Sequence, residues 1–155
     1  MQVDLTKLDT KPGASVLALA ESLAQSKYLE RRYDHAKEQQ VLASFDDERA
    51  VGFLLLLVQV IGAEEGRSPL VVHGEALTEG YVNAFGVDPA YRRRGVGRLL
   101  QEAAIAYCRS VGCYQIRSRS PITATENYAL KLAMGYTIQP SNENDSYYFI
   151  KRIEP

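Results

Sequence analysis

The stretch VDPAYRRRGVGRLL, residues 87–100, decides how the rest of the chain is interpreted. An apolar run over residues 81–87 leads into an Asp-Pro turn and a basic loop with two glycines, after which apolar residues recur at helical spacing from Val96. A strand, a glycine loop and a helix N-terminus form an anion site, because backbone N–H groups and the helix dipole point to one place. Gly95 and Gly97 can adopt positive φ and let the backbone approach a ligand closely. Four arginines add charge suited to phosphate, so the stretch predicts a phosphate-binding loop.

Spacing distinguishes this loop from two better-known phosphate loops. A P-loop has the pattern Gly-x-x-x-x-Gly-Lys-Ser/Thr, whereas a single residue separates Gly95 from Gly97 and Arg98 follows. The dinucleotide fingerprint Gly-x-Gly-x-x-Gly needs a glycine where Leu100 stands. The pattern that fits is Arg/Gln-x-x-Gly-x-Gly/Ala after a strand ending in Val-x-Pro, and residues 87–97 match it.

With this pattern the chain resembles the GNAT superfamily of acetyl-CoA-dependent N-acyltransferases, from about residue 81 to residue 109 and more weakly as far as Gly135 and Tyr136. The resemblance implies acetyl-CoA as the cosubstrate, with its pyrophosphate on the backbone amides of residues 92–98. It also implies that the pantetheine arm pairs with the exposed edge of the preceding strand, and that an amide at or beside Val87 polarises the thioester. The predicted cofactor-binding residues are therefore Phe85, Gly86, Val87, Arg92, Arg93, Arg94, Gly95, Val96, Gly97, Arg98 and Asn127.

The resemblance also implies a reaction, in which a primary amine of a small molecule or a protein attacks the thioester directly in a ternary complex. An alkylammonium has a pKa near 10.4, so a general base would help at neutral pH. Glu79, just before the strand, is one candidate. Asn83 is another, because period-two counting puts it on the face of Phe85 and Val87, where it could hold a water. We interpret Gly86 as a bulge that opens the strand edge, with a simple packing role as the alternative.

The chain departs from the family where the proton donor for the leaving thiolate is expected. Many members carry Asn-x-x-Ala-x-x-Leu-Tyr before a Gly-Phe pair, and its Tyr protonates the thiolate. Counting back from Gly135, the Tyr position is Lys131 and the Asn position is Ala124. Lys131 itself could donate a proton, but we interpret it as a solvated helix residue and Tyr128, about one helical turn earlier, as the better acid candidate. Asn127 is displaced by one turn from the family position and is expected to reach the pantetheine.

Composition bounds the remaining possibilities. A chain of 155 residues, 46% hydrophobic and 24% charged, predicts a single globular domain over residues 1–155. A net charge of −1 and a pI of about 6.1 argue against nucleic-acid binding through the arginine cluster. Cys108 and Cys113 form no metal or redox motif, which together with the lack of a signal peptide predicts a cytoplasmic protein with reduced thiols. No metal site is expected around the two histidines, and residues 51–60, the longest apolar run, are too short to span a membrane.

Hydrophobic patterning predicts the order β-α-α-β-β-β-α-β-α-β-β. This order indicates an α/β domain with a mixed, mostly antiparallel sheet flanked by helices, which is the fold that the resemblance implies. The second helix is expected over residues 28–39, and a loop over residues 62–79 with a short strand at residues 71–72. The expected strands cover residues 2–8, 41–45, 50–61, 81–87, 114–118, 136–139 and 147–153.

Two functions therefore compete. The first is an N-acetyltransferase. The second is a non-catalytic acyl-CoA-binding or regulatory module, a hypothesis motivated by the missing Tyr at Lys131. Family members are often dimers, so a homodimer is compatible with the sequence, and no motif names the acceptor amine.

Overall fold

The computed structural model describes residues 4–5, 11–141, 143 and 145–155. Seven strands form one sheet in the order β1-β2-β3-β6-β7-β9-β8, and β4 pairs with β5 in a separate hairpin. The strands are β1 (Asp4–Leu5), β2 (Glu38–Asp46), β3 (Arg49–Val60), β4 (Val71–Val72), β5 (Glu75–Ala76), β6 (Thr78–Val87), β7 (Gln115–Pro121), β8 (Thr137–Pro140) and β9 (Ser146–Arg152). The helices are α1 (Ala14–Ser22), α2 (Ser26–Glu30), α3 (Val96–Ser110) and α4 (Thr125–Ala133), with single 3₁₀ turns at η1 (Ala63–Glu65) and η2 (Pro89–Tyr91).

The predicted element order and mixed sheet are confirmed, and β6 with β7 is the parallel pair among the described strands. The predicted helix over residues 28–39 is wrong beyond Glu30, where α2 ends. Residues 34–35 form a turn, and from Lys37 the chain pairs with β3: Lys37 N donates to Val58 O at 2.7 Å, and Glu38 lies opposite Val58. Pairing with a long buried strand therefore outweighs local helix propensity here. Of the strand predicted over residues 2–8, Asp4–Leu5 is observed and the rest lies outside the described residues. None of the described helices is both long and apolar enough to cross a membrane.

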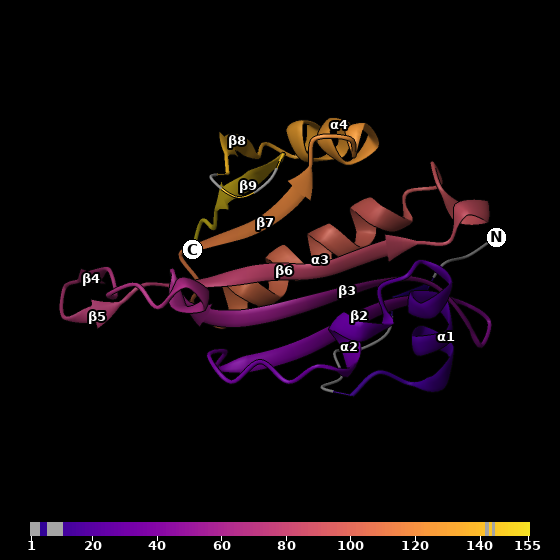
Figure 1. Ribbon diagram of the computed structural model, residues 1–155, viewed down its shortest axis with the longest axis horizontal. Helices are drawn as coiled ribbons and strands as arrows, with labels where there is room; N and C mark the ends of the chain where they lie inside the picture. Colours follow the sequence, from indigo (N-terminus) through magenta and orange to yellow (C-terminus); the bar gives the residue numbers. More distant parts are fainter. Residues whose placement is uncertain (1–3, 6–10, 142, 144) are drawn as a thin grey trace.

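Strand β3 is the centre of the molecule. Its residues are buried from Ala50 to Gln59, which explains a sequence without alternation. Leu54 and Leu56 belong to the core under α3, whereas Leu55 and Leu57 belong to the core under α1. The two N-terminal helices therefore cover one face of the sheet and α3 covers the other (Figure 1).

The neighbouring strands β6 and β7 pair over only part of their length. The parallel register runs from Glu79 opposite Gln115 to Val82 opposite Ser118 and then stops. Beyond that point β7 stays with β9 as far as Pro121, while β6 stays with β3 as far as Val87. Figure 1 shows β7 turning away from β6 and carrying β8, β9 and α4 with it. The sheet is thus split at the end that leads to the basic loop.

Candidate functional site

The Asp-Pro turn after β6 is fixed in place by its aspartate. Asp88 is buried, and its carboxylate accepts hydrogen bonds from Ala90 N at 2.9 Å and from Arg49 Nη2 at 2.6 Å. Its own N–H donates to Val51 O at 2.9 Å, which ties the turn to β3. The loop that follows therefore leaves the sheet from a rigid base.

The two glycines of the loop differ in conformation. Gly95, the N-cap of α3, uses the left-handed region, with φ 82°. Gly97 lies inside the first turn of α3, and the other positive φ of the loop belongs to Arg93, at 62°. Gly97 is needed for space instead, since a Cβ there would lie 3.2 Å from Phe85 Cζ and 3.5 Å from Leu130 Cδ2. The first turn of α3 therefore has no side chain at Gly97, on the side that faces β6 and α4.

The N-terminus of α3 is left open for an anion. Its first turn contains no acidic residue, and no side chain caps it. The first N–H groups of a helix have no partner within the helix, so they and the dipole favour negative charge at this point. Arg98 pairs with Glu102 at 3.0 Å along the helix. A cavity of about 930 Å³ lies in front of this end, lined by the loop, by the edge of β6 and by the first turns of α4.

The exposed edge of β6 carries a bulge and a side-chain partner. Asn83 is the extra residue, because Leu55 lies opposite Ala84 and Leu56 lies opposite Val82. Beyond the bulge, Gln25 from the segment between α1 and α2 pairs with the Phe85 backbone: Gln25 Nε2 donates to Phe85 O at 3.1 Å, and Phe85 N donates to Gln25 Oε1 at 3.3 Å. One amide thus binds the strand edge as an added strand would.

Two expectations about this edge are corrected by the bulge. Gly86 is not the bulged residue; a Cβ there would lie 2.6 Å from Leu23 Cδ1 and 2.9 Å from Phe53 Cε1, so its role is the packing alternative. Asn83 does not share the face of Phe85, because the extra residue reverses the alternation. Its Nδ2 donates to Tyr33 Oη at 2.7 Å on the side of α2, while Phe85 packs against the core under α3.

A second cavity, of about 630 Å³, occupies the split between β6 and β7. It shares Gln25, Phe85, Ala124 and Asn127 with the first cavity, so the two lie next to each other along the edge of β6. Below, this second cavity is called the cleft. Its lining includes Tyr28, Tyr81, Asn83, Gln101, Ser118, Arg119, Ser120, Asn127, Lys131 and Asp145.

The family model for the acetyltransferase (GNAT) family matches residues 12–136, which is most of the chain and includes the loop, both cavities' main walls and α4. The chain belongs to the GNAT acetyltransferase family. It is therefore an acyltransferase. A search of curated proteins by sequence finds no match.

Solved structures of GNAT acetyltransferases share the whole fold with this chain. A provisionally assigned acyl-CoA N-acyltransferase from Klebsiella pneumoniae has a TM-score of 0.74 at 20% identity, with 98% of each chain covered. NAA60 from Arabidopsis thaliana, in complex with a bisubstrate analogue, has a TM-score of 0.72 at 16% identity, with 99% of each chain covered. The ribosomal-protein-S18-alanine N-acetyltransferase from Escherichia coli has a TM-score of 0.66 at 14% identity, over 99% of this chain and 96% of that one.

In this GNAT acetyltransferase, the surroundings of Lys131 differ from those expected from the sequence. The expectation of a solvated helix residue is wrong: Lys131 is 1% exposed and lines the cleft. Its Nζ donates to Gln101 Oε1 at 3.0 Å and lies 4.4 Å from the centre of the Tyr136 ring. The hydrophobic pattern of α4 could not show this, because a lysine counts as a polar residue in any such pattern.

Tyr128 and Asn127, neighbours on α4, point to different places. Tyr128 lines neither cavity; its hydroxyl donates to Pro121 O at 3.2 Å, and its ring packs on Tyr147 and Phe149. Its role as the acid stays a prediction, and this placement argues against it. Asn127 lines both cavities and donates to Ser120 Oγ at 2.9 Å, as a pantetheine-binding residue should be placed.

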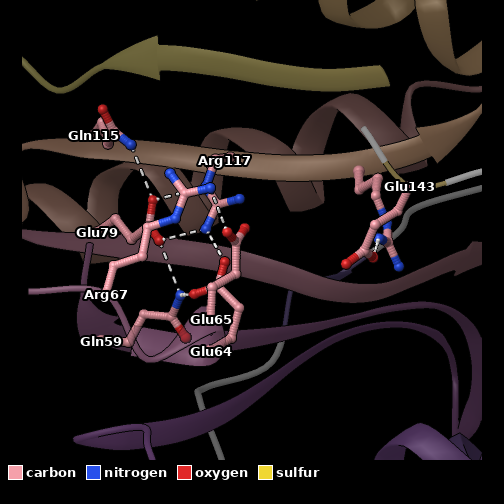
Figure 2. A network of polar contacts seen from close by, with 9 residues as sticks. Gln59, Glu64, Glu65, Arg67, Glu79, Gln115, Arg117 and Glu143 are labelled. Carbon is pink, nitrogen blue, oxygen red and sulfur yellow. Dashed lines mark hydrogen bonds and ion pairs between the residues drawn. The ribbon is translucent and has the colours of Figure 1, made fainter. Parts of the chain in front are cut away.

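Glu79 lies where β6 and β7 are still paired, opposite Gln115 and away from the split, inside a polar network (Figure 2). It is fully buried and outside the cleft lining, and each carboxylate oxygen accepts two hydrogen bonds. The donors are Gln115 Nε2 and Arg117 Nε to one oxygen and Gln59 Nε2 and Arg117 Nη2 to the other, at 2.8–3.0 Å. Arg117 also pairs with Glu64. Burial would raise the pKa of the Glu64 carboxyl, but the contacts with Arg117 hold this pKa below its usual range. The carboxylate of Glu79 thus has no free face for a substrate proton, and its role as a base stays a prediction without support from its surroundings.

Sequence reasoning missed several polar residues that line the cleft. Gln25, Gln101 and Ser118 are among them; they stand in no motif, and their importance comes from the split between two strands that are distant in the sequence. The one available signal was the run of polar residues after Tyr114, which is unusual for a central strand. Among the described residues, no three His, Cys, Asp or Glu side chains gather as a metal site would require.

Proposed function

We propose that this protein transfers an acetyl group from acetyl-CoA to a primary amine, by direct attack of the amine within a ternary complex. The observation that carries the proposal is that the two cavities adjoin along one strand edge. One begins at the open N-terminus of α3, which suits a pyrophosphate, and it shares four lining residues with the cleft beside the edge of β6. A ligand with phosphates at one end and a reactive acyl group at the other fits this arrangement.

The residues present fit acetyl-CoA. The backbone of Arg92 to Arg98 and its guanidinium groups would hold the pyrophosphate, and bare Gly97 leaves room beside Phe85. The β6 edge at residues 85–87 would pair with the amides of the pantetheine arm. Gln25 supports this assignment, because its side-chain amide already makes such a pair of hydrogen bonds with Phe85. The cosubstrate supplies a thioester, an acyl group activated toward amines.

The acceptor amine would enter the cleft from the side of α2 and β9. Tyr28, Tyr81 and Asn83 line this approach, together with Arg119, which pairs with Glu143 at 2.6 Å. Asn83 would orient the amine or a water through the oxygen that its contact with Tyr33 leaves available. The name of one structural neighbour, the ribosomal-protein-S18-alanine N-acetyltransferase, points to a protein substrate, so peptides with free N-termini belong in the acceptor panel beside small amines.

The test begins with calorimetric titration of the purified protein with acetyl-CoA, with CoA and ATP as comparison ligands. We expect micromolar binding of acetyl-CoA and much weaker binding of ATP. Thiol release is then measured with polyamines, amino acids and peptides as acceptors. Transfer to any amine supports the enzyme. Tight binding without transfer to a broad panel would instead favour the non-catalytic acyl-CoA-binding module, and no binding at all would overturn both.

Gly97→Glu tests the loop assignment directly. A Cβ there is tight against Phe85, and the carboxylate would occupy the anion site, so we expect acetyl-CoA affinity to fall at least about 100-fold. Gly13→Glu is the matched control, because it also adds a carboxylate at a helix N-terminus, and a Cβ at Gly13 meets nothing within 4 Å. A folded Gly97→Glu protein with unchanged affinity would refute the assignment.

A further inference from the structure

Lys131 is a cation buried in the wall of the cleft, and no carboxylate among the described residues pairs with it. Its side chain is 1% exposed, and its polar contact is with Gln101, a neutral amide. Within the described residues no carboxylate is hydrogen-bonded to it, in contrast to Arg117, which is paired with two carboxylates. Burying a lysine without a counter-ion is unfavourable, so such a group is retained where it serves a reaction or a ligand.

The polar atoms around Lys131 are also incompletely bonded. Gln101 Oε1 accepts from Lys131 and from Tyr136 Oη, but Gln101 Nε2 is buried without a partner among the described residues. Ser118 Oγ and Asn127 Oδ1 are in the same condition, and all three side chains line the cleft. Buried polar atoms are normally hydrogen-bonded, so this cluster indicates a polar ligand group at this point.

We propose that Lys131 is the catalytic proton donor to the leaving thiolate of CoA, with Gln101 holding its Nζ in the cleft. This inference rests on the proposed function. As the amine nitrogen bonds to the carbonyl carbon, the C–S bond breaks and sulfur keeps the bonding electron pair. A proton passes from Lys131 Nζ to that sulfur, which leaves a neutral amine and a thiol. The acetylated nitrogen loses its extra proton to water, and Lys131 takes a proton back before the next turnover.

The surroundings of Lys131 favour giving up a proton. Burial lowers the pKa of its ammonium to about 7. The titratable side chain in contact with it is Tyr136, and Tyr28, Tyr81, Arg119 and Asp145 line the same cleft. A donor with a pKa near 7 can protonate a thiolate, whose ordinary pKa is about 8.5, without an energetic penalty.

The kinetic test uses Lys131→Met, which keeps the length of the side chain and removes its proton, with Lys151→Met as the matched control outside both cavities. We expect kcat to fall roughly 100-fold at pH 6.5 while the dissociation constant of acetyl-CoA changes less than threefold. The ratio of wild-type to variant kcat should shrink as pH rises above about 7, because the wild-type donor is then deprotonated. Lys131→Arg keeps the charge but releases no proton, and should be as slow as Lys131→Met. A fall in kcat below threefold, or loss of acetyl-CoA binding in Lys131→Met, would overturn the role.

A second readout needs no turnover. In protein labelled with ¹³C-lysine, the titration of Lys131 is followed by NMR in the free protein, with CoA, and with desulfo-CoA, which lacks only the sulfur. We expect CoA to shift the Lys131 titration and desulfo-CoA to leave it near its value in the free protein. Equal effects of the two ligands would mean that Nζ does not contact the sulfur. If wild type transfers acetyl to no amine, the proposed function fails, and this comparison still decides the place of Lys131.

Discussion

The two ends of the β6–β7 pair differ in how completely their buried polar side chains are hydrogen-bonded. At the paired end, where Glu79 lies opposite Gln115, a carboxylate with both oxygens fully bonded meets a guanidinium that serves two carboxylates. At the split end, Lys131 has a neutral partner, and three nearby side chains each leave a buried polar atom unbonded. Among the described residues the paired end leaves one such atom, Gln59 Oε1.

This difference separates structural from functional polarity in one strand pair. A closed network of charges fixes the geometry of the sheet and offers nothing to a ligand. Unbonded atoms and an unpaired cation destabilise the empty protein and are satisfied by a bound group. Titratable residues near a cleft therefore cannot be ranked as catalytic by residue type alone; their partners decide.

Breaking the paired end should have the largest effect. Arg117→Met leaves Glu79 buried without its cation, so we expect the free energy of unfolding to fall by about 3–5 kcal/mol. Chemical denaturation measures this change. Adding Glu79→Gln should restore a large part of the loss, because the uncompensated charge is gone. Little destabilisation in Arg117→Met would show that the network does not hold the sheet.

At the split end the same kind of change should stabilise the protein. Lys131→Met removes an unpaired buried ammonium, so its melting temperature should exceed that of wild type. The gain should be larger at pH 6 than at pH 9. From about pH 7 up to the unfolded pKa near 10.4, the unfolded chain keeps a proton that the folded chain has lost, so wild-type stability rises with pH there. A gain independent of pH would contradict a depressed lysine pKa.

A smaller effect is expected at Gln25. If its amide occupies the place of the pantetheine arm, Gln25→Ala should tighten acetyl-CoA binding by about fivefold, the equivalent of a single neutral hydrogen-bond pair. Gln39→Ala is the control, since Gln39 Nε2 also donates to a backbone carbonyl, that of Arg31, away from both cavities. Weaker binding in Gln25→Ala would mean that Gln25 contacts the cosubstrate instead of competing with it.

The smallest effect separates the two candidate acids. Tyr128→Phe removes a hydroxyl that bonds Pro121 O, from a side chain that lines neither cavity, and we expect kcat to change less than twofold. Steady-state kinetics beside Lys131→Met give the comparison. A loss of 30-fold or more would return the proton donor to Tyr128.

The sequence was sufficient for the parts of the molecule that depend on local pattern. The loop of residues 92–98, the long helix after it and the strands on either side follow from glycine spacing and hydrophobic periodicity. The order of elements then indicated the mixed sheet. These features are encoded by neighbours in the chain, so they could be predicted.

The chemistry of the cleft depends on residues that are distant from one another in the sequence, so it could not be predicted from local pattern. The bulge at Asn83 reverses which face its side chain takes, and period-two counting has no means of locating an inserted residue. The burial of Lys131 depends on Gln101, 30 residues earlier, and Glu79 is neutralised by Arg117, 38 residues later. Both candidate assignments that followed helix or strand position alone, Tyr128 and Glu79, fell on side chains with other partners.

The contact between Gln25 and Phe85 also bears on the rate at which the edge of β6 becomes accessible. The N–H of Phe85 lies on the split edge of β6 and has only the 3.3 Å contact with a side chain to shield it, and Gln25 follows Ala24, whose φ of 58° is unfavourable for an alanine. The exchange of this one amide hydrogen with deuterated solvent therefore counts how often Gln25 leaves the strand. The same departures set an upper limit on how fast any extended chain can take its place.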